Sequence, residues 1–269
     1  MANLKKLTIA LGLSLSAFAA QRACAFDPPT NDAQRIVARM NPSNCNETTY
    51  GFYCYINVNS KLVSVIVPRN YISSGKCMIH FHGLRVASWD RTASGTIQYF
   101  KFVDSLYMEA PDTLMIAPVG SYGSSNYSLQ RDYGELTQNL KLLDGVDART
   151  DETCASIIVS GHSAAYRPIT QLLGNANNYP SNRFSKMLKN VFLFDALYSS
   201  SVSGYSKWIG SSTEHYAWNV SPSGSSTRPN SLKIAKSARY TNVLSSISNH
   251  WNLVRDRYFA EFLRGRKIP

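Results

Sequence analysis

The chain has 269 residues, of which 44% are hydrophobic, and its formal net charge at pH 7 is +11. This length allows one large domain with a sizeable core. The positive charge favours acidic partners such as polyanionic walls, lipid headgroups or acidic glycans, with plain solubility as the alternative explanation. The basic residues are scattered and no nucleic-acid motif is present, so a nucleic-acid-binding class is excluded.

The first 25 residues have the pattern of a secretory signal. Lys5 and Lys6 form a basic start, residues 7–20 are apolar or small, and Ala23-Cys24-Ala25 is a small-x-small cleavage pattern before Phe26. The apolar run is short for a membrane span, which needs about 20 residues, although an uncleaved anchor is the alternative. We therefore expect cleavage and a secreted or periplasmic protein.

The mature chain, residues 26–269, is expected to form a single domain. It has 244 residues, and its net charge falls to +8 because the signal carries three basic residues and no acid. No later stretch is long and apolar enough to span a membrane, so we expect a soluble protein, and we expect a monomer.

Strand and helix patterns alternate along most of the mature chain. The predicted strands are 52–58, 61–67, 77–81, 113–118, 155–160, 190–194 and 215–220. The predicted helices are 33–40, 133–143, 164–173 with Gly174 as C-terminal cap, 231–238 and 251–263, and the Ser-rich residues 199–213 are predicted to form a loop. This order predicts an α/β fold with a mostly parallel central sheet, helices on both faces, and antiparallel strands at the N-terminal edge.

Four cysteines remain once Cys24 leaves with the signal. An even number in an exported chain indicates two disulfides. Cys45 and Cys54 flank a turn and are the favoured pair, which leaves Cys77 with Cys154, between two core strands. Buried free thiols at Cys77 and Cys154 are the alternative. The spacing contains no zinc pattern, so no metal is expected.

The central motif is Gly161-His162-Ser163-Ala164-Ala165, between a predicted strand and a predicted helix. A sharp strand-to-helix turn needs small residues on both sides of the nucleophile, and it lifts the Ser163 hydroxyl above the sheet. The motif resembles the nucleophile turn of the α/β-hydrolase superfamily, in particular its secreted serine esterases and lipases, with Ala165 in place of the usual second glycine. An ordinary helix-capping Ser163 is the alternative.

The resemblance extends to an oxyanion loop at His82-Gly83-Leu84, directly after the strand 77–81. It implies that the N–H groups of Leu84 and Ala164 stabilise an oxyanion. His82 is expected to order this loop. A tight turn with a packed histidine is the alternative.

The superfamily order of nucleophile, acid and base implies the two partners of Ser163. Two histidines follow Ser163, and His250, just before the last helix, is favoured over His215. Two carboxylates lie between Ser163 and His250. Asp195 is favoured because it ends a strand at the rim where catalytic groups gather, and Glu214 is the fallback.

Together these residues predict a serine hydrolase that cleaves a carboxylic ester through a Ser163–His250–Asp195 triad and an acyl-enzyme, with no cofactor. His82, Arg85 and Arg167 are candidate contacts to the substrate. The expected substrate is an ester or an acylated compound, and it could be polyanionic or associated with the cell wall. Two alternatives remain open: a peptidase or amidase with the same triad, and a binding module that has kept the fold without catalysis.

Overall fold

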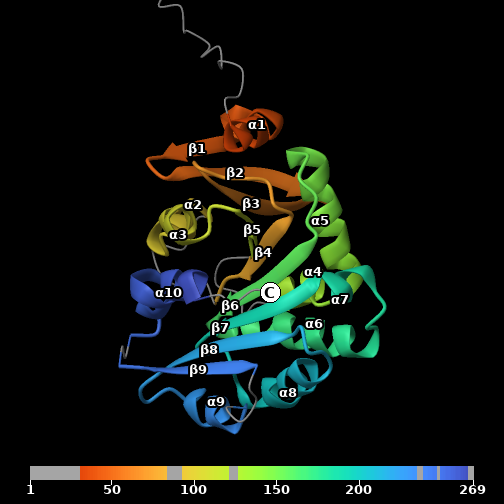
Figure 1. Ribbon diagram of the computed structural model, residues 1–269, viewed down its shortest axis with the longest axis vertical. Helices are drawn as coiled ribbons and strands as arrows, with labels where there is room; N and C mark the ends of the chain where they lie inside the picture. Colours follow the sequence, from red (N-terminus) through yellow and green to blue (C-terminus); the bar gives the residue numbers. More distant parts are fainter. Residues whose placement is uncertain (1–30, 84–92, 121–126, 235–238, 247–248, 266–269) are drawn as a thin grey trace, which may run out of the picture.

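The computed structural model describes residues 31–83, 93–120, 127–234, 239–246 and 249–265, so the predicted signal segment, Leu84 and Arg85 lie outside the described residues. Nine strands in these ranges form one sheet, in the order β1-β2-β3-β5-β4-β6-β7-β8-β9 (Figure 1). The strands are β1 Cys45–Thr48, β2 Gly51–Val58, β3 Lys61–Pro68, β4 Lys76–Phe81, β5 Thr113–Pro118, β6 Ser156–His162, β7 Leu188–Phe194, β8 Tyr216–Pro222 and β9 Tyr240–Ser245. The pairs β1–β2, β2–β3 and β3–β5 are antiparallel, and every other pair is parallel.

Helices cover both faces of this sheet, so the predicted fold class is confirmed (Figure 1). The helices are α1 Asp32–Arg39, α2 Ala93–Tyr99, α3 Phe102–Glu109, α4 Tyr127–Tyr133, α5 Leu136–Thr150, α6 Tyr166–Asn178, α7 Arg183–Met187, α8 Val202–Gly210, α9 Arg228–Ile234 and α10 Phe259–Gly265. Helices α2, α3 and α10 pack on one face and the others on the opposite face. Within the described ranges, no helix has the length and apolar character that crossing a membrane requires.

The central strands are apolar on both faces because both faces are covered. Successive residues enter opposite cores: Ile158 contributes to the core under α3 and α10, and its neighbour Val159 contributes to the core under α5 and α6. Phe192 and Leu193 divide in the same way on β7. This alternation is the two-residue period of a strand, and it explains why these strands have continuous apolar sequences.

Two local predictions are wrong. The Ser-rich residues 199–213 contain helix α8, because Tyr205, Trp208 and Ile209 share one helical face and are buried. Gly174 lies inside α6 rather than at its end, since the helix continues to Asn178. Because α6 starts at Tyr166, Pro168 falls in its first turn, where a missing N–H is tolerated.

Both expected disulfides are present. Cys45 and Cys54 face each other across β1 and β2 in register, and Cys77, on β4, is bonded to Cys154, just before β6. The second bond links the starts of two neighbouring parallel strands. The opposite ends of these strands lead to His82-Gly83 and to Ser163.

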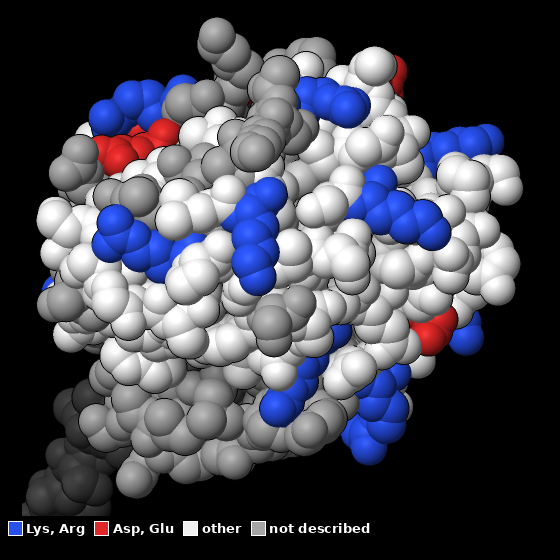
Figure 2. All heavy atoms as spheres, turned by 90° about the horizontal axis from the view of Figure 1, so that it is seen from below, with Lys and Arg blue, Asp and Glu red and all other residues white. Residues whose placement is uncertain are grey.

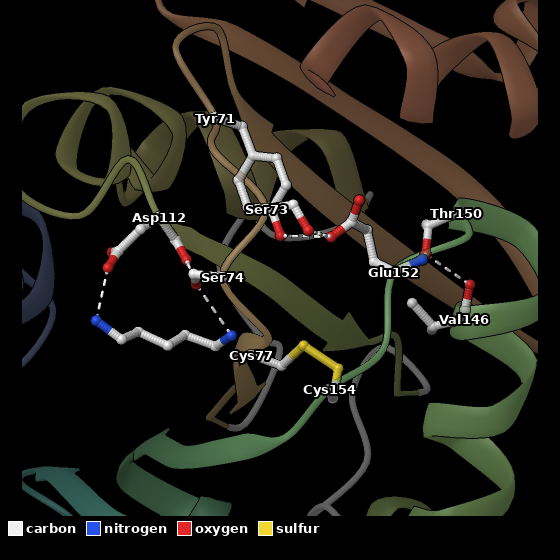
Figure 3. The surroundings of a disulfide bond; sticks show 10 residues. Tyr71, Ser73, Ser74, Cys77, Asp112, Val146, Thr150, Glu152 and Cys154 are labelled. Carbon is white, nitrogen blue, oxygen red and sulfur yellow. Dashed lines mark hydrogen bonds and ion pairs between the residues drawn. A yellow bond between two sulfur atoms is a disulfide. The ribbon is translucent and has the colours of Figure 1, made fainter. Parts of the chain in front are cut away.

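A buried carboxylate lies beside the Cys77–Cys154 bond (Figure 3). Glu152 is 3% exposed and accepts hydrogen bonds from Arg35 of α1, from the Tyr71 hydroxyl at 3.1 Å and from the Ser73 hydroxyl at 2.6 Å. These partners come from α1 and from the loop between β3 and β4. Glu152 therefore ties both segments to the connection between α5 and β6.

The charges are unevenly divided along the chain, which corrects the expectation of scattered basic residues. Residues 26–152 hold 11 Lys and Arg against 13 Asp and Glu, whereas residues 153–269 hold 14 against four. The second part supplies β6–β9, and α8 and α9 lie at the lower end in Figure 1. Figure 2 looks onto this end, and Lys and Arg dominate its charged side chains.

Candidate active site

Strand β6 presents Ser163 on a sharp turn. The strand ends at His162, a 3₁₀ turn covers Ser163–Ala165, and α6 follows directly. Ser163 has φ of 54°, in the left-handed region that costs an L-residue about 1–2 kcal/mol. A Cβ at Gly161 would lie 2.5 Å from Ile169 Cδ1 and 2.7 Å from Ala165 Cβ, so only glycine fits there. The structure therefore has a strained strand–turn–helix arrangement around Ser163.

Asp195 lies one strand over, directly after β7, and it also has a positive φ, of 48°. One carboxylate oxygen, Oδ2, is 2.5 Å from His250 Nδ1. The other, Oδ1, accepts hydrogen bonds from the Ser225 hydroxyl at 2.5 Å and from the Thr227 hydroxyl. Burial alone would raise the pKa of Asp195, but the hydrogen bonds from His250, Ser225 and Thr227 outweigh it and hold the pKa below its ordinary value. The carboxylate is ionised and oriented toward His250.

His250 is held between Asp195 and the strand end that carries Ser163. Its Nδ1 is engaged by Asp195, so Nε2 is the ring nitrogen left to exchange a proton. The carbonyl oxygen of His250 is 3.0 Å from Nε2 of His162, the residue that precedes Ser163, and the two imidazole centroids are 4.3 Å apart. The structure thus brings Ser163, Asp195 and His250 to one edge of the sheet, at the carboxyl ends of parallel strands.

The two fallback residues lie elsewhere. Glu214 is exposed and forms an ion pair with Lys189. His215 stacks on Trp208 with ring centroids 4.2 Å apart, and its Nδ1 is 2.8 Å from the Trp208 carbonyl oxygen. Both residues precede β8, whereas Asp195 follows β7, and β7 and β8 are parallel. Glu214 and His215 therefore lie near the opposite edge of the sheet from Ser163.

The predicted oxyanion loop is described up to Gly83. A Cβ at Gly83 would lie 3.1 Å from Ser163 Cβ, so the backbone of this loop lies against Ser163. His82 is 6% exposed: Nε2 accepts from the Gly120 N–H at 2.8 Å, and Nδ1 donates to the Gly83 carbonyl oxygen at 2.6 Å. These two contacts tie His82 to Gly83 and to Gly120. Ala164 directly follows Ser163 in the 3₁₀ turn.

Two tyrosines and Arg167 lie next to Ser163. The rings of Tyr166 and Tyr198 are 4.7 Å apart, and Arg167 Nε donates to the Tyr166 hydroxyl at 3.3 Å. Burial and the charge of Asp195 raise the pKa of Tyr198, while a hydrogen bond with the Ser163 side chain lowers it. Tyr198 is therefore a protonated hydroxyl beside Ser163.

Several residues of this site were not identified from the sequence. Ser225 and Thr227, which bind Asp195, come from the segment after β8, and the available signal was a run of Ser and Thr following a predicted strand. The contact between His162 and His250 left no local signal, because 88 residues separate them. In the part of the chain that the structure describes, no group of three or more His, Cys, Asp or Glu side chains is arranged to hold a metal ion.

No protein-family model matches this chain, and no curated protein is significantly similar to it in sequence. Similar solved structures include an esterase from Pyrobaculum calidifontis, which is 12% identical with a TM-score of 0.51 over 91% of this chain and 96% of the esterase. An α/β serine hydrolase homologue from Coxiella burnetii is 14% identical with a TM-score of 0.47, over 81% of this chain and 98% of that chain. At these identities the likeness to the Pyrobaculum esterase concerns the fold. The chain has the α/β-hydrolase fold, which the motif around Ser163 implied.

Proposed function

We propose that the protein is an exported serine hydrolase that cleaves carboxylic esters, with Ser163 as nucleophile, His250 as base and Asp195 as the acid. The observation that carries the proposal is the 2.5 Å contact between Asp195 Oδ2 and His250 Nδ1, at the sheet edge where Ser163 is held at φ 54°. Open α/β sheets carry their active sites at this edge.

In the proposed reaction, His250 Nε2 takes the proton of Ser163 while Oγ attacks the acyl carbonyl carbon. The negative charge that develops on the carbonyl oxygen is stabilised by the N–H groups of Ala164 and Leu84, of which Leu84 lies outside the described residues. The protonated His250 gives its proton to the departing alcohol, and an acyl-enzyme forms. Water, deprotonated by His250, then attacks the acyl group, the bond to Ser163 Oγ breaks, and Oγ takes the proton back from His250 as the carboxylic acid leaves.

Esters are the expected substrates because an alkoxide is a better leaving group than an amine anion. The neighbouring Tyr166–Tyr198 pair suits an aromatic or carbohydrate group next to the scissile bond. Arg167, which contacts Tyr166, is a candidate partner for a carboxylate on the substrate. An acyl compound with a ring and an acidic group is therefore the first to include in a substrate panel.

Export is supported by the disulfides. Cys45–Cys54 and Cys77–Cys154 account for all four cysteines after residue 25, and such bonds persist in oxidising compartments. We propose that residues 1–25 are removed and that the mature protein is secreted or periplasmic. Sequencing the N-terminus of protein from a secreting host tests this, with Phe26 as the expected first residue.

The proposed chemistry is tested by labelling the mature protein with a fluorophosphonate probe, in parallel with Ser163→Ala. We expect the wild type to be labelled and Ser163→Ala to remain unlabelled, because the probe requires an activated serine. Ester and peptide panels then separate esterase from amidase activity. If the folded, disulfide-bonded wild type is not labelled, the proposal is wrong and a non-catalytic binding module becomes the better description.

A further inference from the structure

His162 is a fully buried histidine that lies between three parts of the site. It precedes Ser163 in the chain, and its ring is 4.3 Å from the His250 ring and 5.0 Å from the Trp251 ring. On another side, its Nδ1 would be 3.0 Å from a Cβ placed on Gly83. The imidazole therefore contacts both the segment that carries the base and the oxyanion loop.

The hydrogen bonding of His162 determines where its proton lies. Nε2 is 3.0 Å from the carbonyl oxygen of His250, and a carbonyl oxygen only accepts, so Nε2 carries the hydrogen. Nδ1 is buried without a hydrogen-bond partner among the described residues and lies against Gly83. A hydrogen on Nδ1 would find no acceptor there. The structure thus fixes one neutral tautomer.

The charge state of His162 matters because its ring lies beside the base. Burial lowers the pKa of His162 well below its ordinary value, His250 and His80 lower it further, and Asp195 and the hydrogen bond to the His250 carbonyl act in the opposite direction. The ring is therefore neutral at physiological pH. A neutral ring adds no repulsion when His250 accepts a proton 4.3 Å away.

We propose that His162 is a positioning residue for the base: its Nε2–H holds the backbone of His250 against the end of β6, which also presents Ser163. This inference rests on the proposed function of the Ser163 site. A single side-chain hydrogen bond spans 88 residues of sequence and joins the nucleophile strand to the base. The base thereby keeps its distance from Ser163 while its side chain is oriented by Asp195.

Hydrogen bonds within this segment shape its backbone. The Asn249 side chain accepts from the Trp251 N–H at 2.9 Å and from the Asn252 N–H at 3.3 Å. Apart from packing, the described attachments of His250 itself are its side-chain bond to Asp195 and its backbone bond to His162.

Two variants test the proposal with the full mature protein. His162→Leu removes the donor and keeps an apolar side chain in the buried site, whereas His162→Gln keeps an N–H donor that can reach the same carbonyl. We expect His162→Leu to lower kcat on the best ester about 10-fold or more with KM changed less than about twofold, because a displaced base weakens the chemical step rather than binding. His162→Gln should recover most of kcat.

A second measurement does not depend on catalysis. We expect amide hydrogen exchange at Trp251 and Asn252 to be faster in His162→Leu than in the wild type and His162→Gln, since the segment loses its attachment. If the wild type hydrolyses no ester but this difference in exchange is seen, the attachment of His250 through His162 is supported and the proposed function is wrong. The inference is overturned if His162→Leu matches the wild type in both measurements, or if the Leu and Gln variants lose kcat equally.

Discussion

Asp195 stays ionised inside the protein because three side chains donate hydrogen bonds to it. His250 engages one oxygen, and the Ser225 and Thr227 hydroxyls engage the other. No Lys or Arg forms an ion pair with it among the described residues. The carboxylate thus has its negative charge available to orient the imidazole and to stabilise it when protonated.

In the proposed mechanism, replacing Asp195 by Asn should therefore disable His250 as the base while preserving the shape of the site. The amide would offer an N–H to Nδ1 and favour the wrong imidazole tautomer, so we expect kcat for ester hydrolysis to fall about 10⁴-fold. Steady-state kinetics and the rate of phosphonate labelling measure this effect. Glu214→Gln, which changes an exposed carboxylate paired with Lys189, is the matched control and should keep wild-type rates. Equal losses in both variants would remove Asp195 from the mechanism.

Asp147 makes the protein less stable as the pH rises. It lies in the last turn of α5, where a negative charge is unfavourable, and burial raises its pKa from 3.8 to about 6. Between about pH 4 and pH 6 the unfolded chain ionises while the folded chain stays protonated at Asp147. The stability contribution of this group is therefore present below pH 4 and is lost as the pH passes 6.

We expect Asp147→Asn to lack this decline. Relative to the variant, the wild type should lose about 1 kcal/mol of unfolding free energy between pH 4 and pH 6.5, a figure reduced for solvent screening of a half-buried group. Urea denaturation of both proteins across this range measures it. A difference that is flat or that rises with pH would contradict the assignment.

At the scale of elements, the sequence predicted most of the parallel strands because their patterns are local, but it missed β9. Strand β5 matches the prediction in both bounds, β6 differs by one residue at its start and two at its end, and β7 begins two residues earlier than predicted. Helix α8 was missed because its serines suggested a loop, although its three buried apolar residues have helical spacing. Gly174 suggested a helix end, but it faces open space inside α6, where the helix tolerates it.

The candidate site was selected partly from local pattern and partly from the resemblance. Ser163 was selected from a strand–turn–helix motif, and Asp195 and His250 were selected from the order of nucleophile, acid and base that the resemblance implies. The partners of Asp195 and the contact between His162 and His250 depend on how distant segments pack. A single sequence carries no signal for such contacts.

The two disulfides should differ in their contribution to stability. Cys77 and Cys154 are 77 residues apart, and Cys45 and Cys54 are nine apart. In the chain-entropy account, the longer loop restricts the unfolded chain more, so removing the Cys77–Cys154 bond should cost about 2 kcal/mol more than removing the other. Denaturation of the two double-alanine variants measures this difference. Equal losses would indicate that native contacts, such as those of Glu152, decide the outcome.

At the scale of the whole molecule, the positive charge is concentrated in the part that contains β6–β9. Helices α8 and α9, at the lower end of Figure 1, carry the exposed residues Lys207 and Lys233, and Figure 2 looks onto this end of the molecule. Such an asymmetric charge orients a protein on an anionic surface. We propose that this end faces polyanionic material around the cell.

Charge reversal tests this orientation. We expect the double variant Lys207→Glu/Lys233→Glu to bind anionic lipid vesicles more weakly than the control double variant Lys141→Glu/Arg149→Glu. The control changes the net charge by the same amount, at two exposed residues of α5. Binding of the wild type should decrease as salt rises from about 50 to 300 mM, because ions screen the surface charge. Equal weakening by the two pairs would show that net charge alone matters.

The left-handed backbone at Ser163 and Asp195 has a consequence for engineering. Glycine adopts this conformation more easily, so glycine would relieve backbone strain at Ser163. At Asp195 glycine would relieve the same strain but would remove the acceptor of the hydrogen bonds from His250, Ser225 and Thr227. In the proposed mechanism Ser163→Gly abolishes catalysis. A selection for heat resistance alone would therefore favour an inactive molecule at this position, and directed evolution of this scaffold needs an activity screen in every round.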